Sequence, residues 1–377
     1  MTMRIVGGGL LAGGIAYLLL AWWTVLRGLP LNKPAPVHWP PVSVMIPACG
    51  ATPRLIDCLR SVCRQTYPSI QFVFGLHAAD DAARPIIEQV IAEFHNRDMT
   101  LVIDTRRIGA NPKNSNLANM LPAVRHDVLV MVDADVLVEP DFVSAIIQPL
   151  ADASVGGVTC LYKAAPQPGL ASRLGALSIN DWFIPSALVD LSRRDMDLCY
   201  GAAIAVSRRA LDAVGGFAAM ADAVAQDYVF GHDLRAAGFE LRLAPTIVET
   251  VVGEPGLAAL LRHELRWNRA VRAVRPLDHA LSIFMSPLLP GGLLLLAAAP
   301  WRMAVGVVLL QQSLRIGLHG VLRVKLALPP AEPWLLPLRE ILNAALWATA
   351  FLSRRIRWGD TLLVTGDGLT MRRDASD

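Results

Sequence analysis

The segment Asp127-Val-Leu-Val-Met-Val-Asp133-Ala-Asp135-Val136 is the most informative part of this chain of 377 residues. Its five uninterrupted apolar residues, Val128 to Val132, are typical of a strand buried on both faces of a parallel sheet. The run ends at two aspartates spaced i, i+2, whose side chains point the same way in an extended chain. Open α/β sheets bind ligands at this edge, and paired carboxylates suit a divalent cation that holds a sugar-nucleotide diphosphate. The alternative is an ordinary strand-to-turn exit, where aspartate is common.

Apolar and amphipathic segments alternate on both sides of this run. Alternation at this spacing implies βαβ units and a mostly parallel sheet, so we expect an α/β fold. The expected strands span 42–46, 71–76, 100–103, 155–162, 242–245 and 247–252, and the expected helices span 52–64, 82–95, 140–150, 208–214 and 226–237.

Two polar segments of this region have both a simple and a functional interpretation. The segment 109–117 is an ordinary Asn/Pro turn or a loop that approaches a phosphate, because Lys113 lies among asparagines just before the acidic strand. Asp227 lies in the first turn of a predicted helix, where capping is its simplest role. The residue types alone leave both choices open.

The composition points to a membrane protein. Hydrophobic residues make up 54% of the chain and charged residues 18%, below the roughly 25% of soluble domains. A net charge of +3 without an aromatic-basic groove pattern argues against nucleic-acid binding. The five cysteines form no CxxC pair, which indicates neither a disulfide framework nor a zinc site but free thiols in a reducing cytosol.

The N-terminal apolar run, 5–26, is long enough to cross about 30 Å of hydrocarbon. Trp22 and Trp23 near its end favour an uncleaved anchor over a signal peptide, because aromatic rings prefer the membrane interface. Arg27, Lys33 and the proline-rich link 30–41 suit an exit on the cytoplasmic side. We therefore expect residues 1–27 to be a transmembrane anchor and 42–255 a cytoplasmic catalytic domain.

The C-terminal third is predicted to bind and cross the membrane. In the helix 257–274, Arg262, Arg266 and Arg269 share one face and Trp267 lies on the adjacent one, which indicates either an interfacial helix at 256–278 or a solvated basic face. Two apolar segments within 281–320 predict a transmembrane hairpin. Polar residues interrupt 334–352, which predicts an interfacial or re-entrant segment, and the arginines of 353–377 predict a cytoplasmic tail.

The order of the motifs resembles that of a known family. Gln65-x-Tyr67-Pro68, Asn111-Pro112-Lys113, Asp133-x-Asp135, Gln226-Asp227-Tyr228 and His263-x-x-Arg266-Trp267 follow one another as in membrane-bound GT-A glycosyltransferases of family 2/21 type. The chain is most similar to bacterial hopanoid-biosynthesis glycosyltransferases and ceramide glucosyltransferases. The resemblance implies a Rossmann-like GT-A domain with N- and C-terminal transmembrane helices, in the bacterial inner membrane and facing the cytoplasm. Asn180-Asp-Trp-Phe and Arg262-His-Glu-Leu-Arg-Trp look more like the hopanoid branch.

The resemblance also implies roles for single residues. Asp133 and Asp135 would hold the nucleotide-sugar and its divalent cation, Mg²⁺ or Mn²⁺, and Asp227 would be the catalytic base. The remaining matches place Arg266 and Trp267 near the donor diphosphate or the acceptor, and Asn111, Lys113 and Asn116 on the donor side.

Two positions depart from the family pattern. His263 replaces the Gln or Arg that opens the last motif, and a neutral imidazole can bind a metal or a phosphate. Ala78 stands where the ceramide enzymes carry the first Asp, so Asp81 is assigned to the donor side in its place.

The implied function is inverting transfer from a UDP-sugar, UDP-N-acetylglucosamine in the hopanoid branch, to a hydroxyl of a membrane lipid such as bacteriohopanetetrol. A ceramide glucosyltransferase that uses UDP-glucose is the nearest alternative. A processive polysaccharide synthase would need more membrane spans, and a non-catalytic scaffold would not need Asp133, Asp135, Asp227 and Arg266.

Overall fold

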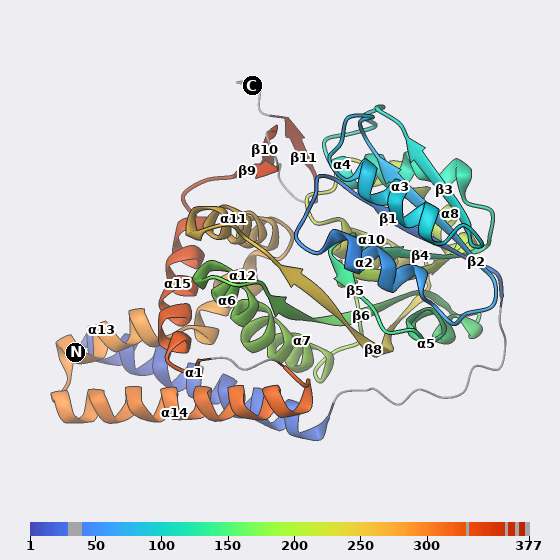
Figure 1. Cartoon of the computed structure of the whole chain (residues 1–377). Coiled ribbons are helices and arrows are strands. Elements are labelled where there is room, and N and C mark those ends of the chain that lie inside the picture. The colour runs from blue at the N-terminus through green and yellow to red at the C-terminus, as the bar shows by residue number, and fades with distance from the viewer. Residues whose placement is uncertain (29–39, 329–331, 359–360, 366–368, 374–377) are drawn as a thin grey trace.

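The apolar run after Asp127 forms strand β4 (Val128–Val132) of an eight-stranded sheet with the order β3-β2-β1-β4-β7-β6-β8-β5. The computed structural model describes residues 1–28, 40–328, 332–358, 361–365 and 369–373. Figure 1 shows the sheet at the centre of the molecule. Its other strands are β1 (Val42–Pro47), β2 (Ile70–Leu76), β3 (Asp98–Ile103), β5 (Val136–Leu137), β6 (Val155–Pro166), β7 (Ala203–Ser207) and β8 (Glu240–Val252).

The predicted α/β class with a mostly parallel sheet is confirmed. Strands β1, β2, β3 and β4 pair in parallel, as do β6 and β8. Strand β4 also pairs with β7, which runs antiparallel to it. The two strands predicted at 242–245 and 247–252 are one long strand, β8, whose pairing with β6 contains an irregularity near Thr159–Leu161.

Side chains of β4 alternate between two apolar cores, as the period of two requires. Val130 and Val132 face the core that contains α2 (Leu55–Cys63), α3 (Arg84–Glu93) and α5 (Phe142–Ile147). Leu129 and Met131 face the core that contains α4 (Pro112–Met120), α8 (Arg208–Ala213), α9 (Gly216–Ala219) and α10 (Gln226–Ala236). Burial on both faces explains why this strand is an unbroken apolar run.

The polar segment 109–117 is a helix start, not the loop that we predicted. Helix α4 begins at Pro112, a residue that suits the first helical position because it has no N–H to leave unpaired. Asn111 is the N-cap, and its side chain accepts a hydrogen bond from the Asn114 N–H.

Two long apolar helices, α1 (Thr2–Arg27) and α14 (Trp301–Lys325), lie side by side along one side of the catalytic domain (Figure 1). Both are long and apolar enough to cross a membrane. The first limb of the predicted hairpin is broken into α12 (Pro276–Leu281), η4 (Ser282–Met285) and α13 (Leu288–Ala298), with a 60° bend. Pro287 lies at the break, where a residue without an N–H cannot continue the helix.

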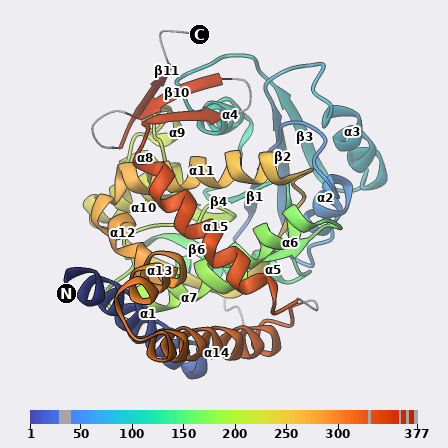
Figure 2. The same ribbon diagram turned by 90° about the vertical axis from the view of Figure 1, so that its left-hand side faces the viewer.

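Helix α15 (Leu335–Ala350) packs across α11 (Leu257–Val274), as Figure 2 shows. The polar residues Arg339 and Glu340, which suggested an interfacial segment, are buried inside the protein. A three-stranded antiparallel sheet of β9 (Arg355–Trp358), β10 (Thr361–Thr365) and β11 (Met371–Arg373) follows, which the sequence did not predict. The predicted link 30–41 and parts of the predicted tail lie outside the described residues.

Candidate active site

A cavity of about 480 Å³ lies at the carboxyl edge of β4, below α11. Its apolar and aromatic lining includes Tyr162, Ile179 and Phe183. Its polar and charged lining includes Lys113, Asp133, Asp135, Gln226, Asp227, Glu254, His263, Glu264 and Arg266.

The acidic pair is held by backbone hydrogen bonds from neighbouring strands. The Asp133 N–H donates to Ala202 O at 3.1 Å, and the Val251 N–H donates to Asp135 O at 2.9 Å. Burial and, next in size, the charge of Asp133 raise the pKa of Asp135 to about 6. The two negative carboxylates repel each other in this half-buried site, so a nearby positive charge stabilises them.

Lys113 supplies one such charge from the first turn of α4. Its ammonium forms an ion pair with Asp133 and donates a hydrogen bond to Gly201 O at 3.3 Å. The lysine therefore lies beside Asp133 in the lining of the cavity, where a phosphate group of a donor would compete with Asp133 for the ammonium.

Asp227 lies in the first turn of α10 and lines the same cavity. Burial raises the pKa of its carboxyl, while the charge of Lys113 lowers it. The adjacent wall is Gly201, where an added Cβ would lie only 3.0 Å from Asp227 Oδ2. A larger residue at 201 would displace the carboxylate, so the glycine keeps this part of the cavity open.

Helix α11 brings three predicted residues to the cavity. Burial lowers the pKa of Arg266 to about 10, although the charges of Asp227 and Asp133 oppose this shift. His263 contacts the Trp267 ring at 4.2 Å between centroids, and its Nδ1 lies 2.8 Å from Glu254 Oε1. An ionised carboxylate only accepts hydrogen bonds, so His263 donates to Glu254 from Nδ1.

Residues 9–370 match the model of a protein family described as glycosyl transferase family 21. The chain belongs to this family. Among curated relatives, the ceramide glucosyltransferase of Gibberella zeae is 28% identical over 153 residues, which are 36% of this chain and 29% of the relative. Ceramide glucosyltransferase 1 of Caenorhabditis elegans is 21% identical over 225 residues, which are 59% of this chain and 48% of the relative. The chain thus spans between about a third and a half of these relatives.

The fold also matches that of a solved glycosyltransferase. A mannosyltransferase from Pyrobaculum calidifontis, solved in complex with GDP-Man and Mn²⁺, superposes with a TM-score of 0.56 at 20% identity. The match covers 93% of this chain and 99% of the mannosyltransferase. The predicted GT-A fold of family 2/21 type is therefore confirmed.

The structure places three of the residues predicted for this glycosyltransferase's donor site away from the lining of the cavity. Asn111 and Asn116 are buried, and their side-chain amides donate to Ala223 O and Gly75 O, each at 2.9 Å. Asp81 Oδ1 accepts from the Gly50 and Ala83 N–H groups, each at 2.8 Å. In the described part of the chain, these three side chains form hydrogen bonds with backbone groups, and their contact with a donor stays a prediction.

One wall of the family 21 site was not predicted from the sequence. The π-helical turn η3 (Ser178–Phe183) carries the Asn180-Asp-Trp-Phe stretch, and Phe183 stacks on Tyr162 at 4.4 Å between centroids. The Asn180 amide bonds to both backbone groups of Ala164 on β6. The resemblance had marked this stretch, but a π-helical turn has no periodicity of its own in the sequence.

Proposed function

We propose that this glycosyltransferase moves a sugar from a UDP-sugar to a hydroxyl group of a membrane lipid, with inversion at the anomeric carbon. The observation that carries the proposal is the convergence of Asp227, Arg266 and the Asp133/Asp135 pair on one cavity that also has apolar and aromatic lining residues. The charged residues suit a sugar diphosphate, and the apolar residues suit the part of a lipid next to its hydroxyl.

Asp227 is the proposed general base. An acceptor hydroxyl is a poor nucleophile, and a carboxylate that takes its proton during attack contributes about 10²–10⁴-fold to the rate. Because burial raises the pKa of Asp227, it is a stronger base than an exposed aspartate. Attack by the hydroxyl in a single displacement inverts the anomeric centre, and the proton ends on Asp227.

Arg266 is proposed to stabilise the leaving diphosphate. Negative charge develops on this group as the anomeric C–O bond breaks, and a buried guanidinium is already in place to stabilise it. The nearby carboxylates Asp227 and Asp133 keep Arg266 charged in spite of its burial. Trp267, one position further along α11, lies at the same cavity.

The acidic pair fits a divalent cation. The carboxylates of Asp133 and Asp135 are hard oxygen donors, and their mutual repulsion is relieved by a cation. Among the described residues no third His, Cys, Asp or Glu joins them in a group that could hold a metal, so the diphosphate and water would supply the other ligands. When bound, Mg²⁺ or Mn²⁺ would neutralise charge on the diphosphate, and the solved mannosyltransferase that shares this fold contains Mn²⁺.

Two acceptors have specific support. The curated relatives are ceramide glucosyltransferases, which favours transfer of glucose from UDP-glucose to ceramide. The Asn180-Asp-Trp-Phe stretch, which forms the apolar wall, favours the hopanoid branch, with N-acetylglucosamine and bacteriohopanetetrol. We also propose that the chain lies in the bacterial inner membrane with the active site facing the cytoplasm, where nucleotide sugars are made.

The test is a membrane assay that combines UDP-glucose and UDP-N-acetylglucosamine with ceramide and bacteriohopanetetrol, and identifies lipid products by mass. An N-acetylhexosamine added to the hopanoid supports the hopanoid assignment, and a hexose added to ceramide supports the ceramide assignment. Turnover of either kind also excludes a non-catalytic scaffold. Transfer to neither lipid contradicts the proposal, and a growing polysaccharide product would favour a processive synthase instead.

A further inference from the structure

Two adjacent charged residues of α15 are buried and bind different parts of the molecule. Arg339 and Glu340 are 1% and 0% exposed. Arg339 donates two parallel hydrogen bonds to Glu264 of α11, at 2.8 and 2.6 Å, and a third to Leu174 O at 3.2 Å. Glu340 accepts from the side chain of Gln311 on α14 and from the backbone N–H of Leu288, each at 3.0 Å.

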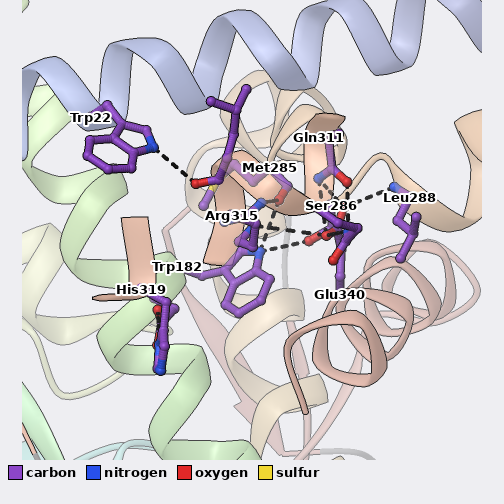
Figure 3. Close-up of polar contacts among 12 residues, drawn as sticks. Trp22, Trp182, Met285, Ser286, Leu288, Gln311, Arg315, His319 and Glu340 are labelled. Carbon is purple, nitrogen blue, oxygen red and sulfur yellow. Dashed lines mark hydrogen bonds and ion pairs between the residues drawn. The ribbon is translucent and has the colours of Figure 1, made fainter. Parts of the chain in front are cut away.

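Glu340 of α15 and Arg315 of α14 form hydrogen bonds with backbone groups on the two sides of the break between η4 and α13 (Figure 3). A broken helix leaves backbone groups without helical partners, and a membrane offers no water to bind them. The Met285 carbonyl on one side of the break accepts from Arg315 and from Trp182 Nε1, and the Leu288 N–H on the other side donates to Glu340. Arg315 also lies over the Trp182 ring, 4.4 Å from its centroid.

Stability alone does not explain four buried charges. Replacement of a buried ion pair by apolar residues of similar size is often neutral or stabilising, because the charges lose their hydration. What a bidentate Arg–carboxylate pair adds is a fixed relative orientation of the two elements that carry it. The Arg339–Glu264 pair therefore fixes how α11 is rotated against α15.

The two elements that contact these buried charges, α11 and η3, both form walls of the catalytic cavity. Glu264 follows His263 and lies two positions before Arg266 on α11. Trp182 belongs to η3, whose Ile179 and Phe183 also line the cavity. Helix α15 thus contacts α11 directly through Arg339, and it reaches η3 through Glu340 and Arg315 of α14.

We propose that Arg339 and Glu340 are positioning residues that lock α11 and η3 to the broken membrane segment, and thereby hold Arg266 and Trp267 over the cavity. The inference rests on the proposed role of Arg266 at the leaving diphosphate. Neither α15 residue lines the cavity, so they act through Glu264 and Trp182. The arrangement makes the geometry of the active site depend on the packing of the membrane segment.

The first test replaces the Arg339–Glu264 pair by leucines in the full-length protein in lipid nanodiscs. Because Glu264 also lines the cavity, the reference for kcat is Glu264→Gln, which keeps the size of this side chain. If the pair only stabilises the fold, Glu264→Leu/Arg339→Leu has the same kcat as this reference. If the pair positions α11, the double variant stays folded but loses about 10- to 100-fold in kcat, since a misplacement of 1 Å has effects of this size. Hydrogen exchange across 257–274 becomes faster at the same time. The control is Arg60→Leu/Glu93→Leu, because that pair has the same bidentate geometry between α2 and α3, away from the cavity.

Two single variants extend the test. Arg339→Lys keeps the charge but loses the planar fork, and we expect an intermediate loss of kcat even if the double variant fails to fold. Glu340→Gln keeps an acceptor for Leu288 but removes the charge. We expect faster exchange in 257–274, although the polar partners of Glu340 among the described residues lie outside α11. Unchanged exchange in 257–274 and unchanged kcat in the folded variants would overturn the inference. A wild-type protein without transferase activity would instead contradict the proposed function, while the exchange data would still test the positioning.

Discussion

Asp227 is the single residue on which the proposed chemistry most depends. Asp227→Asn keeps the size of the side chain and removes the base, so we expect kcat to fall by about 10²–10⁴-fold while UDP-sugar binding persists. Product mass and calorimetric titration with the UDP-sugar measure the two effects. The control is Asp233→Asn, a more exposed carboxylate on the same helix. Turnover near the wild-type rate in Asp227→Asn would mean that the base is elsewhere.

The pH dependence of transfer follows from the same carboxyl. A general base acts when deprotonated, and burial raises the pKa of Asp227, so kcat should fall on the acid side at a pH above the usual aspartate value of about 4. Lys113 lowers this pKa, so Lys113→Gln should move the acid limb of the kcat profile to higher pH. Arg125→Gln removes a more exposed cation and should not move it. An acid limb that stays in place in Lys113→Gln would assign it to another group.

Residue spacing predicted correctly which charged side chains line the cavity, but it did not predict correctly which asparagine side chains do. The i, i+2 spacing at a strand end brought Asp133 and Asp135 together, and the helical spacing of the last motif brought His263, Arg266 and Trp267 to one wall. Asn111 and Asn116 bind backbone instead. An amide is both donor and acceptor, so its residue type does not show whether it faces a ligand or the chain.

Helix α4 gives a prediction at the scale of the element. Asn111→Ala removes the N-cap and the bond to Ala223 O, so we expect a loss of about 1–2 kcal/mol in the free energy of unfolding. Asn111→Asp keeps the cap acceptor and should lose less. Thermal unfolding measures both variants. If Asn111→Ala lowers UDP-sugar affinity without lowering stability, the asparagine contacts the donor after all.

The contact between α1 and α13 gives a second prediction at this scale. An added Cβ at Gly14 would lie 2.3 Å from Pro287 Cγ, whereas one at Gly9 would meet nothing within 4 Å. Alanine raises helix propensity by about 1 kcal/mol at both sites. We expect Gly14→Ala to be less stable than Gly9→Ala by about 1–3 kcal/mol, the usual size of an overpacking effect. A thiol-reactive dye that reports exposure of the four buried cysteines on heating measures the difference. Equal stabilities would mean that α1 and α13 do not pack this closely in the membrane.

Period and composition predicted most elements but not how they join. Strands β1, β2, β3, β4 and β6 and helix α11 were found because each has one dominant pattern, an apolar run or a 3.6-residue face. Strands β5 and β7 were not predicted, and β8 was predicted as two strands. The break after Met285 was missed because apolar residues continue on both sides of it, and its backbone groups are satisfied by Arg315 and Glu340 from distant elements. Such partners are visible only in three dimensions.

At the scale of the whole molecule, the short C-terminal sheet ties the end of the chain to the catalytic domain. The Val224 N–H donates to Leu369 O at 3.0 Å, and the Met371 N–H donates to Asp222 O at 2.8 Å. Leu363 and Met371 share an apolar cluster with Val224 and with Ala270 of α11. The tail therefore packs within a few residues of Asp227, on the same side of any membrane as the active site.

The helix directions lead to the same topology. Helices α1 and α14 run in the same direction, since Trp22 donates to Leu314 O and Lys325 donates to Leu26 O. Both end in basic residues, Arg27 in α1 and Arg323 with Lys325 in α14, which favours the cytoplasm for both ends. For α14 to start on the far side, the bent segment 276–298 must first carry the chain across.

We therefore expect green fluorescent protein fused at Asp377 to fluoresce, and alkaline phosphatase at the same position to be inactive, because the phosphatase needs the oxidising periplasm. The matched control is a phosphatase fusion at Ala299, between α13 and α14, which should be active. Phosphatase activity at Asp377 would contradict the packing of the tail against the catalytic domain. An inactive fusion at Ala299 together with fluorescence at Asp377 would make 276–298 a re-entrant segment and place α14 along the membrane surface, with its outer residues Leu309, Leu310 and Ile316 in contact with lipid.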